Sequence, residues 1–295
     1  MGKLIGRDLL KLSDINRREL LEILLYAKDL KKSVKHSNLL KGKTLTMLFA
    51  KSSTRTRVSF EIAMAQLGGH PLNLNWDETN FLKGDITDEA RSLGIYSDVI
   101  MTRVFTHDQT IKIADGSGVP VINGMDNLHH PCQALADLLT IYEAKGKFDG
   151  IKIGWVGDGT NVCNSLSQGA ELLKMKMTIA SPKGYEPNIV GLTTTVLQDC
   201  REAAKNADVL VTDSWVSLGL ENEKETRLKV FKPYQLNSHL LSLAKKDCIV
   251  MHCLPAQRGY EITSEVMDSP KSWIFTEAEN RLHTEKALLL KLLRR

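Results

Sequence analysis

The chain has 295 residues, of which 42% are hydrophobic and 25% are charged, and its formal net charge is +4. This length is typical of two domains, and the composition is typical of a soluble globular protein. The basic residues are scattered along the chain rather than gathered in a stripe or tail, which disfavours a nucleic-acid partner.

Membrane insertion and secretion are also disfavoured. No run approaches the ~20 apolar residues of a membrane-spanning helix, and the N-terminal stretch lacks the apolar block of a signal peptide. The number of cysteines is odd and the sequence contains no C-x-x-C pair, which favours a reducing compartment over a disulfide framework. We therefore expect a cytoplasmic protein with no membrane partner.

The first part of the chain alternates between helical and strand patterns. An N-cap pair, Ser13-Asp14, opens a predicted helix over 13–35. Residues 76–88 are polar and irregular, as in a mobile loop. Strands are predicted over 44–50, 70–76, 98–104 and 119–124, and helices over 58–67, 89–97, 108–118 and 131–145.

The alternation then starts again. Strands are predicted over 151–158, 177–182, 208–215 and 248–255, and helices over 161–176 and 276–295, with helical, charged segments between the later strands. Such alternation indicates an α/β fold with parallel sheets covered by helices on both faces. We expect two doubly wound parallel-sheet domains, 1–135 and 145–270, joined by long helices. The C-terminal helix 276–295 is expected to pack back on the first domain.

Polar segments follow several predicted strands. In open α/β sheets, ligands bind beyond the carboxyl ends of the strands. A cleft between the two domains is therefore the expected meeting point of these segments, which are "KSSTRTR", "TRVFTH", "NGMDNLHHPCQ", "DSWVSLG" and "HCLPAQRG".

The stretch "SSTRTR" (52–57) stands at a strand-to-helix junction. A helix N-terminus offers free N–H groups and partial positive charge, and arginine forks match phosphate oxygens. We interpret Ser53, Thr54, Arg55 and Thr56 as an oxyanion site, in preference to a capped helix with solvated arginines. The absent glycine fingerprint argues against a nucleotide P-loop.

Other candidates are weaker taken singly. His130 and Gln133 in "HHPCQ" could bind a carbonyl oxygen or could simply form a helix entry. Asp213 could hold a substrate cation or cap a turn. Arg103, Cys253 and Arg281 have ordinary structural interpretations as a surface residue, a small core residue and a solvated helical residue.

Two kinds of bound group are not indicated. No cluster of residues has metal-ligand spacing. In "GWVGDGTN", Gly157 and Gly159 match a dinucleotide fingerprint but Val162 takes the third glycine position, so a tight turn is favoured over NAD binding. We expect neither a metal nor a cofactor.

Taken together and in order, the motifs resemble the aspartate/ornithine transcarbamylase family. "STRTR" with "SFE", then "HPCQALADLLT", "GDGTNVCNSL" and "EAENR" match along the chain from about residue 5 to its end. "DSWVSLG" resembles the D-x-x-x-S-M-G loop of the ornithine branch, and "HCLP" has that branch's form. The resemblance implies a trimer of two-domain subunits with sites at subunit interfaces and no metal.

The resemblance also implies a first domain, 1–135 with helix 276–295, that binds carbamoyl phosphate. Its implied ligand contacts are Ser53, Thr54, Arg55, Thr56, Arg103, His130, Gln133, Cys253, Leu254 and Arg281. Asn80 in loop 76–88 is a weaker match, and that loop would reach a neighbouring subunit. Arg57 is expected to brace its loop instead of touching ligand.

The second domain, 145–270, would bind ornithine. The implied contacts are Asn161, Asp213, Ser217 and Leu218. Two departures from the family pattern are Leu218 in place of Met and Gln257 in place of His.

The expected reaction is carbamoyl transfer from carbamoyl phosphate to the δ-amine of L-ornithine, giving citrulline and phosphate. The implied catalytic residues are Arg55, Arg103, His130 and Cys253, and Cys253 would orient the amine or accept its proton. The alternatives are transfer to another amine, such as putrescine or an acylated ornithine, and a catalytically silent phosphate-binding homologue. Two questions stay open: whether the reaction runs in the biosynthetic or the catabolic direction, and whether trimers assemble further.

Overall fold

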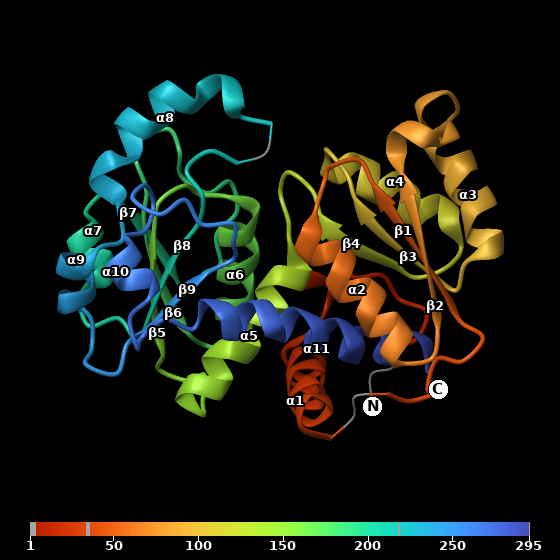
Figure 1. Ribbon diagram of the computed structural model, residues 1–295, viewed down its shortest axis with the longest axis horizontal. Coiled ribbons are helices and arrows are strands. Elements are labelled where there is room, and N and C mark those ends of the chain that lie inside the picture. The colour runs from red at the N-terminus through yellow and green to blue at the C-terminus, as the bar shows by residue number, and fades with distance from the viewer. Residues whose placement is uncertain (1–3, 34–35, 218, 295) are drawn as a thin grey trace. The chain divides into compact units, whose positions relative to one another are not determined.

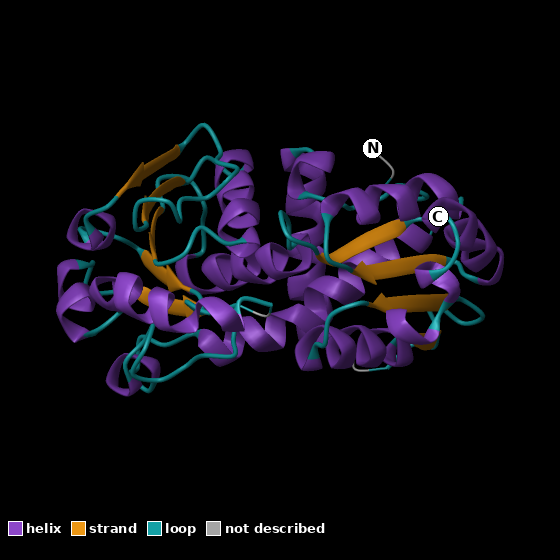
Figure 2. Cartoon of the chain, turned by 90° about the horizontal axis from the view of Figure 1, so that it is seen from above, coloured by secondary structure: helices purple, strands orange, loops and turns teal. Residues whose placement is uncertain are grey.

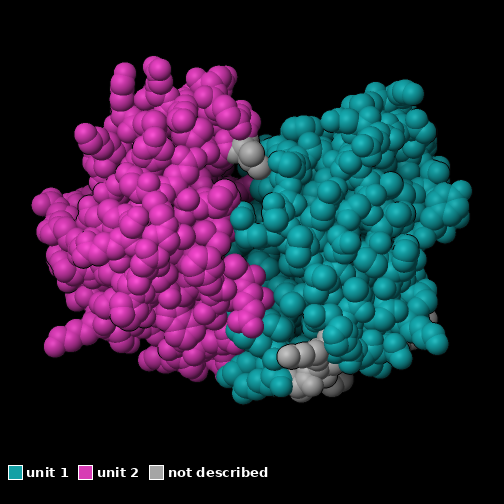
Figure 3. All heavy atoms as spheres, in the orientation of Figure 1, with its two compact units in different colours: residues 1–139, 280–295 teal, residues 140–279 magenta. Residues whose placement is uncertain are grey.

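The chain folds into two compact units, each built on one parallel β-sheet. The computed structural model describes residues 4–33, 36–217 and 219–294. Unit 1 comprises Met1–Leu139 and Asn280–Arg295, and unit 2 comprises Thr140–Glu279 (Figure 3). Helices α5 and α11 each begin in one unit and end in the other (Figure 1).

Unit 1 contains a four-stranded sheet in the order β2-β1-β3-β4, with helices on both faces (Figure 2). Its strands are β1 (Thr44–Phe49), β2 (His70–Asn75), β3 (Val99–Arg103) and β4 (Val121–Met125). Its helices are α1 (Arg17–Ser33), α2 (Thr54–Gln66), α3 (Ile86–Tyr96), α4 (His107–Ser117), the start of α5 (Pro131–Lys145) and the end of α11 (Ile274–Leu293). Short 3-10 turns are η1 (Leu12–Asp14), η2 (Trp76–Glu78) and η3 (Asn80–Leu82).

Unit 2 contains a five-stranded parallel sheet in the order β7-β6-β5-β8-β9. Its strands are β5 (Lys152–Val156), β6 (Lys176–Ala180), β7 (Thr194–Leu197), β8 (Val209–Thr212) and β9 (Ile249–His252). Its helices are α6 (Asn161–Leu172), α7 (Cys200–Ala204), α8 (Lys224–Phe231), α9 (Ser238–Leu243) and α10 (Ser264–Met267), with 3-10 turns η4 (Glu221–Glu223) and η5 (Lys232–Tyr234).

The predicted fold class is confirmed: both units are doubly wound parallel-sheet α/β structures, and the C-terminal part of α11 belongs to unit 1. One strand, β7, is absent from the predicted elements. It is a short edge strand with no fully buried residue, so its sequence carries little apolar signal. The segment 76–88 is less irregular than predicted, because the η2 and η3 turns bring the Trp76 and Phe81 rings to 5.0 Å between centroids.

Helix α3 packs closely against α4 because glycines face the neighbouring backbone. A Cβ added at Gly94 would lie 1.8 Å from the Ser117 carbonyl oxygen, and one at Gly116 would lie 2.3 Å from the Thr87 carbonyl oxygen. Glycine allows this close approach of backbones, which no larger residue could permit without displacement.

No helix among the described residues is both long enough and apolar enough to span a membrane.

Candidate active site

Strand register in unit 1 brings the first predicted site segments together. Arg103, the last residue of β3, is paired with Phe49 at the end of β1 and with Met125 at the end of β4. Its carbonyl oxygen accepts a hydrogen bond from the Ala50 N–H at 2.8 Å. The loops that follow β1, β3 and β4 therefore leave the same edge of the sheet.

Helix α2 begins at the predicted oxyanion stretch. The Ser53 hydroxyl accepts a hydrogen bond from the Thr56 N–H at 3.2 Å and caps the helix. Thr54 is exposed, Arg55 is half-buried and Thr56 is buried. Arg57 donates to Asn75 Oδ1 at 2.9 Å and lies over the Phe49 ring, so it braces this loop as predicted.

Arg281 connects three segments of unit 1. The ordinary interpretation of this residue as a solvated helical arginine is therefore wrong. It is 2% exposed. Its Nη1 donates to Gln133 Oε1 at 2.9 Å, and its Nη2 donates to Thr56 Oγ1 at 3.2 Å and to Glu285 Oε1 at 2.7 Å. The guanidinium thus links the first turns of α2 and α5 to α11.

His130 stands just before α5 and is buried. Burial lowers its pKa well below the ordinary value, and the nearby Arg281, Arg103 and Arg55 guanidiniums lower it further. The imidazole is therefore neutral near pH 7 and can donate one N–H to a ligand oxygen. This arrangement of a neutral donor among arginines suits a carbonyl oxygen next to a phosphate.

Two further residues of unit 1 bear on the predicted phosphate site. Asn80 is exposed at the start of η3, and its carbonyl oxygen accepts hydrogen bonds from the N–H groups of Lys83 and Gly84. Lys51 lies next to the oxyanion stretch and was not singled out from the sequence. Burial and Arg103 lower the pKa of Lys51, while Asp126 raises it, so this lysine belongs to the same charged group.

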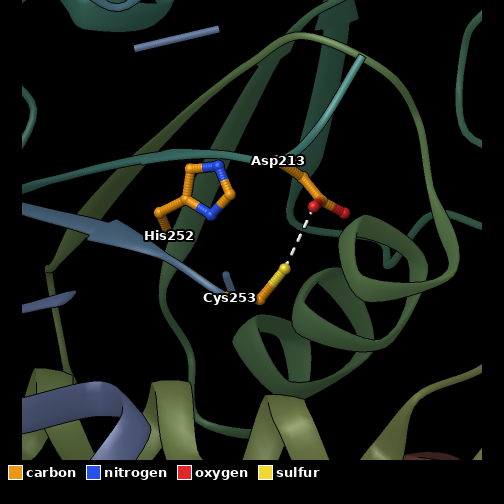
Figure 4. A group of neighbouring side chains, drawn as sticks. All are labelled: Asp213, His252 and Cys253. Atoms are coloured by element: carbon orange, nitrogen blue, oxygen red, sulfur yellow. Dashed lines mark hydrogen bonds between the residues drawn. The ribbon is translucent and has the colours of Figure 1, made fainter. Parts of the chain in front are cut away.

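In unit 2, strand register brings a second group of predicted site residues together. Thr212 at the end of β8 is paired with His252 at the end of β9, so Asp213 and Cys253 directly follow a paired position. The Cys253 thiol donates to Asp213 Oδ1 at 3.0 Å (Figure 4). Asp213 Oδ2 accepts from the Thr160 hydroxyl, which caps α6, at 2.9 Å.

The Asp213, His252 and Cys253 side chains lie as close together as metal ligands would, a grouping that the sequence spacing did not reveal. Their ligand atoms all lie within 4.8 Å of one another. However, both nitrogens of His252 face protein partners: Nδ1 accepts from the Leu254 N–H at 2.8 Å, and Nε2 lies 3.2 Å from Glu261 Oε1. A neutral imidazole so arranged has no spare lone pair for a metal, so the residues present do not fit a metal site.

The remaining predicted residues lie around this group. Asn161 is half-buried at the first position of α6, and Ser217 is half-buried in the loop after β8. Leu218 lies outside the described residues. Leu254 belongs to unit 2 and has a φ of 60°, a left-handed conformation that is uncommon for a residue other than glycine and is enriched at ligand sites.

Arg227 on α8 fixes the loop after β8, and the sequence offered no signal for it. Its Nη1 donates to Asp158 Oδ2 at 2.6 Å and to the Trp215 carbonyl oxygen at 2.9 Å. Burial raises the pKa of Asp158 to about 6, although Arg227 acts to lower it. Arg227 therefore joins the loop after β5 to the loop that carries Ser217.

The structure thus places most of the predicted residues in two groups, one at the strand carboxyl ends of each unit, with Asn80 outside them and Leu218 outside the described residues. Known family models match both units. The model described as "Aspartate/ornithine carbamoyltransferase, carbamoyl-P binding domain" matches residues 7–143. The model described as "Aspartate/ornithine carbamoyltransferase, Asp/Orn binding domain" matches residues 149–292.

Similar proteins and structures carry related names. The ornithine carbamoyltransferase of Methanosarcina mazei is 51% identical, with 98% of this chain and 99% of the relative covered. That of Archaeoglobus fulgidus is 50% identical, with 97% of each covered. The solved structure of ornithine carbamoyltransferase from Pyrococcus furiosus has a TM-score of 0.94 and 46% identity and covers 99% of both chains. The chain belongs to the aspartate/ornithine carbamoyltransferase family.

Proposed function

We propose that this chain is an enzyme that transfers the carbamoyl group of carbamoyl phosphate to the δ-amine of L-ornithine, giving L-citrulline and phosphate. The observation that carries the choice of acceptor is the buried Asp213 carboxylate, held by Cys253 and Thr160 at the carboxyl end of β8. A carboxylate in this position attracts a cationic amine and repels the carboxylates of aspartate. The ornithine carbamoyltransferases that resemble this chain over nearly its whole length support the same acceptor.

The group in unit 1 would bind carbamoyl phosphate. Ser53, Thr54, Arg55 and Thr56 supply hydroxyl, guanidinium and helix N-terminal donors for the phosphate. Arg103 and the neutral His130 would donate to the carbonyl oxygen and stabilise the tetrahedral oxyanion, together with Arg55 and Thr56. Gln133 and Arg281 would complete this side of the site; Arg281 acts through Gln133 and Thr56, which it already holds.

The group in unit 2 would bind ornithine. Asn161, Ser217 and Leu218 would hold the α-amino and α-carboxylate end, and Asp213 would hold the δ-amine. Cys253 and Leu254 would contact the carbamoyl group, with Cys253 also orienting the amine or accepting its proton.

The nucleophile must be the neutral amine. A lysine-like amine has a pKa of ~10.4, so its deprotonation near pH 7.4 costs about 4 kcal/mol. Alignment of two bound reactants and electrostatic stabilisation of the oxyanion would supply most of the rate acceleration. In this step the amine nitrogen forms a bond to the carbamoyl carbon, the bond from that carbon to the phosphate oxygen breaks, and one amine proton leaves.

The test is a colorimetric assay of ureido product with the purified chain, carbamoyl phosphate and one amine at a time. Turnover with L-ornithine is expected, with much less for putrescine and acylated ornithine. Turnover with putrescine but none with ornithine would refute the proposed acceptor, and no turnover with any amine would indicate a silent homologue. A crystal structure with N-phosphonoacetyl-L-ornithine, a bisubstrate mimic, would test every proposed contact, including that of Asn80.

A homotrimer is part of the proposal. Unit 1 presents apolar side chains beside its edge strand: Val58 and Ile62 on α2 and Leu72 on β2 are 52%, 41% and 40% exposed. An unpaired edge strand flanked by exposed apolar residues suits contact with a second copy of the chain. Light scattering after size exclusion should give three times the chain mass of 32.9 kDa. A mass equal to one chain would refute the assembly.

We also propose a cytoplasmic location, because the free cysteines suit a reducing compartment. Cell fractionation tests it: recovery of the protein in the membrane or secreted fraction would refute it.

A further inference from the structure

A buried aspartate of unit 1 lies outside the predicted site residues but within one short turn of one of them in the chain. Asp126 follows β4, is 0% exposed, and stands four residues before His130. A buried carboxylate requires several hydrogen bonds to offset its lost hydration. The partners of Asp126 show what this carboxylate holds.

One carboxylate oxygen holds the backbone that leads to His130. Asp126 Oδ1 accepts from the N–H groups of Leu128 at 2.8 Å and His129 at 2.7 Å. The Asp126 N–H donates in turn to the His129 carbonyl oxygen at 3.0 Å. These three bonds fix the turn 126–129.

The other side of His130 is fixed by helix α5. The His130 carbonyl oxygen accepts from the N–H groups of Gln133 at 3.1 Å and Ala134 at 3.2 Å. His130 therefore lies between a turn set by Asp126 and the first turn of α5, so its imidazole direction depends on both.

The second carboxylate oxygen of Asp126 ties this turn to neighbouring elements. Asp126 Oδ2 lies 2.7 Å from His107 Nδ1 and accepts from Asn123 Nδ2 at 2.7 Å and Thr110 Oγ1 at 3.2 Å. The His107 ring also contacts the His129 ring edge-on, with 4.7 Å between centroids. Burial acts to raise the pKa of Asp126, but His107 and the backbone donors lower it overall, so the group is a carboxylate at neutral pH.

We propose that Asp126, braced by His107, is a positioning residue that sets the direction of the His130 imidazole for carbamoyl transfer. The inference rests on the proposed function. The inference requires that the position of the His130 donor affects the transition state more than it affects the bound substrate, as is usual for groups that stabilise an oxyanion. Asp126 is also a negative charge near Lys51, so its removal makes the surroundings more positive and should not weaken phosphate binding.

Asp126→Asn removes the charge while keeping an oxygen for the Leu128 and His129 N–H groups. We expect kcat for citrulline formation to fall about tenfold to a hundredfold, as misplacement of a reacting group by about 1 Å does. The KM for carbamoyl phosphate should stay within about twofold of wild type or fall. A purely structural role would instead lower the melting temperature and leave kcat per folded site unchanged.

A second pair of variants probes the same network with less risk to folding, because His107 keeps 14% of its side chain exposed. His107→Leu removes the donor to Asp126 and should lower kcat about tenfold, the lower end of the scale for one hydrogen bond to a charged group. His107→Gln retains an N–H donor and should preserve more of kcat than His107→Leu.

Asp98→Asn is the matched control. Asp98 also binds a backbone N–H, that of Thr44 at 2.8 Å, and a side chain, Lys43 Nζ at 2.7 Å, but it lies at the amino ends of the strands, away from the site. Its loss should lower stability and leave kcat unchanged. If the wild-type chain makes no citrulline, the proposed function fails. If wild type is active and both Asp126→Asn and His107→Leu keep kcat within about twofold, the role assigned to Asp126 is wrong.

Discussion

Removal of one partner of a buried ion pair usually destabilises a protein, but we expect Glu285→Gln to become more stable relative to wild type as pH rises. Glu285 is 1% exposed, and burial raises its pKa from an ordinary value of 4.5 to about 7, although Arg281 acts in the opposite direction. The folded chain therefore binds this proton more tightly than the unfolded chain does. The contribution of Glu285 to stability is full below pH 4.5 and is lost as pH rises through 7.

The loss follows from the two pKa values. At about 1.4 kcal/mol for each pH unit between them, it reaches about 3 kcal/mol. Glutamine is nearly isosteric with the protonated acid and does not titrate. Relative to wild type, Glu285→Gln should therefore gain about 3 kcal/mol of unfolding free energy between pH 5 and pH 8. Asp137 also acts on Arg281, so the arginine keeps a nearby carboxylate in the variant.

Urea denaturation at pH 5 and pH 8 measures this difference. Glu19→Gln is a suitable control, because Glu19 is also a buried glutamate that accepts a hydrogen bond from an arginine, Arg7, at 2.6 Å. The reasoning is refuted if Glu285→Gln loses stability relative to wild type as pH rises. That result would show that attraction to Arg281 outweighs the cost of burying the charge.

Three other changes test separate features. Ser53→Ala removes the α2 cap and should cost about 1 kcal/mol in urea unfolding while raising the KM for carbamoyl phosphate; an unchanged KM would remove Ser53 from the phosphate site. Arg227→Met frees the loop after β8 from Asp158 and should raise the KM for ornithine about tenfold, with the KM for carbamoyl phosphate as internal control; equal changes in both would contradict a local role. Gly94→Ala places a Cβ 1.8 Å from the Ser117 carbonyl oxygen and should destabilise the chain by about 3 kcal/mol in thermal unfolding; a neutral result would show that α3 and α4 can separate at no cost.

Most of the fold follows from local patterns. The strands β1, β3, β5, β8 and β9 are largely buried and mostly apolar, and helix α5 occupies the predicted residues 131–145. The edge strand β7 was missed because half-exposed residues do not need to be apolar. The 3-10 turns at 76–82 were missed because their apolar residues, Trp76, Phe81 and Leu82, are too few to give a periodic signal.

The candidate site was predictable where it depends on residue type. Ser53, Arg55, His130 and Asp213 stand at strand ends and helix starts, positions that the chain order already reveals. The partners of these residues were not predictable. Arg281 is separated from Gln133 by 148 positions and from Thr56 by 225, and no local pattern reports contacts over such distances.

The sequence by itself determined the alternation of strands and helices, and hence the parallel sheets and the edges at which polar loops gather. Only the tertiary structure decided which of those polar groups are buried and what each one bonds. It showed that Arg281 braces Thr56 and Gln133, that both nitrogens of His252 face protein partners, and that Asp126 holds the turn before His130. The physical reason is that burial and hydrogen-bond partners depend on segments far apart in the chain. Secondary structure depends mainly on neighbours within a few residues.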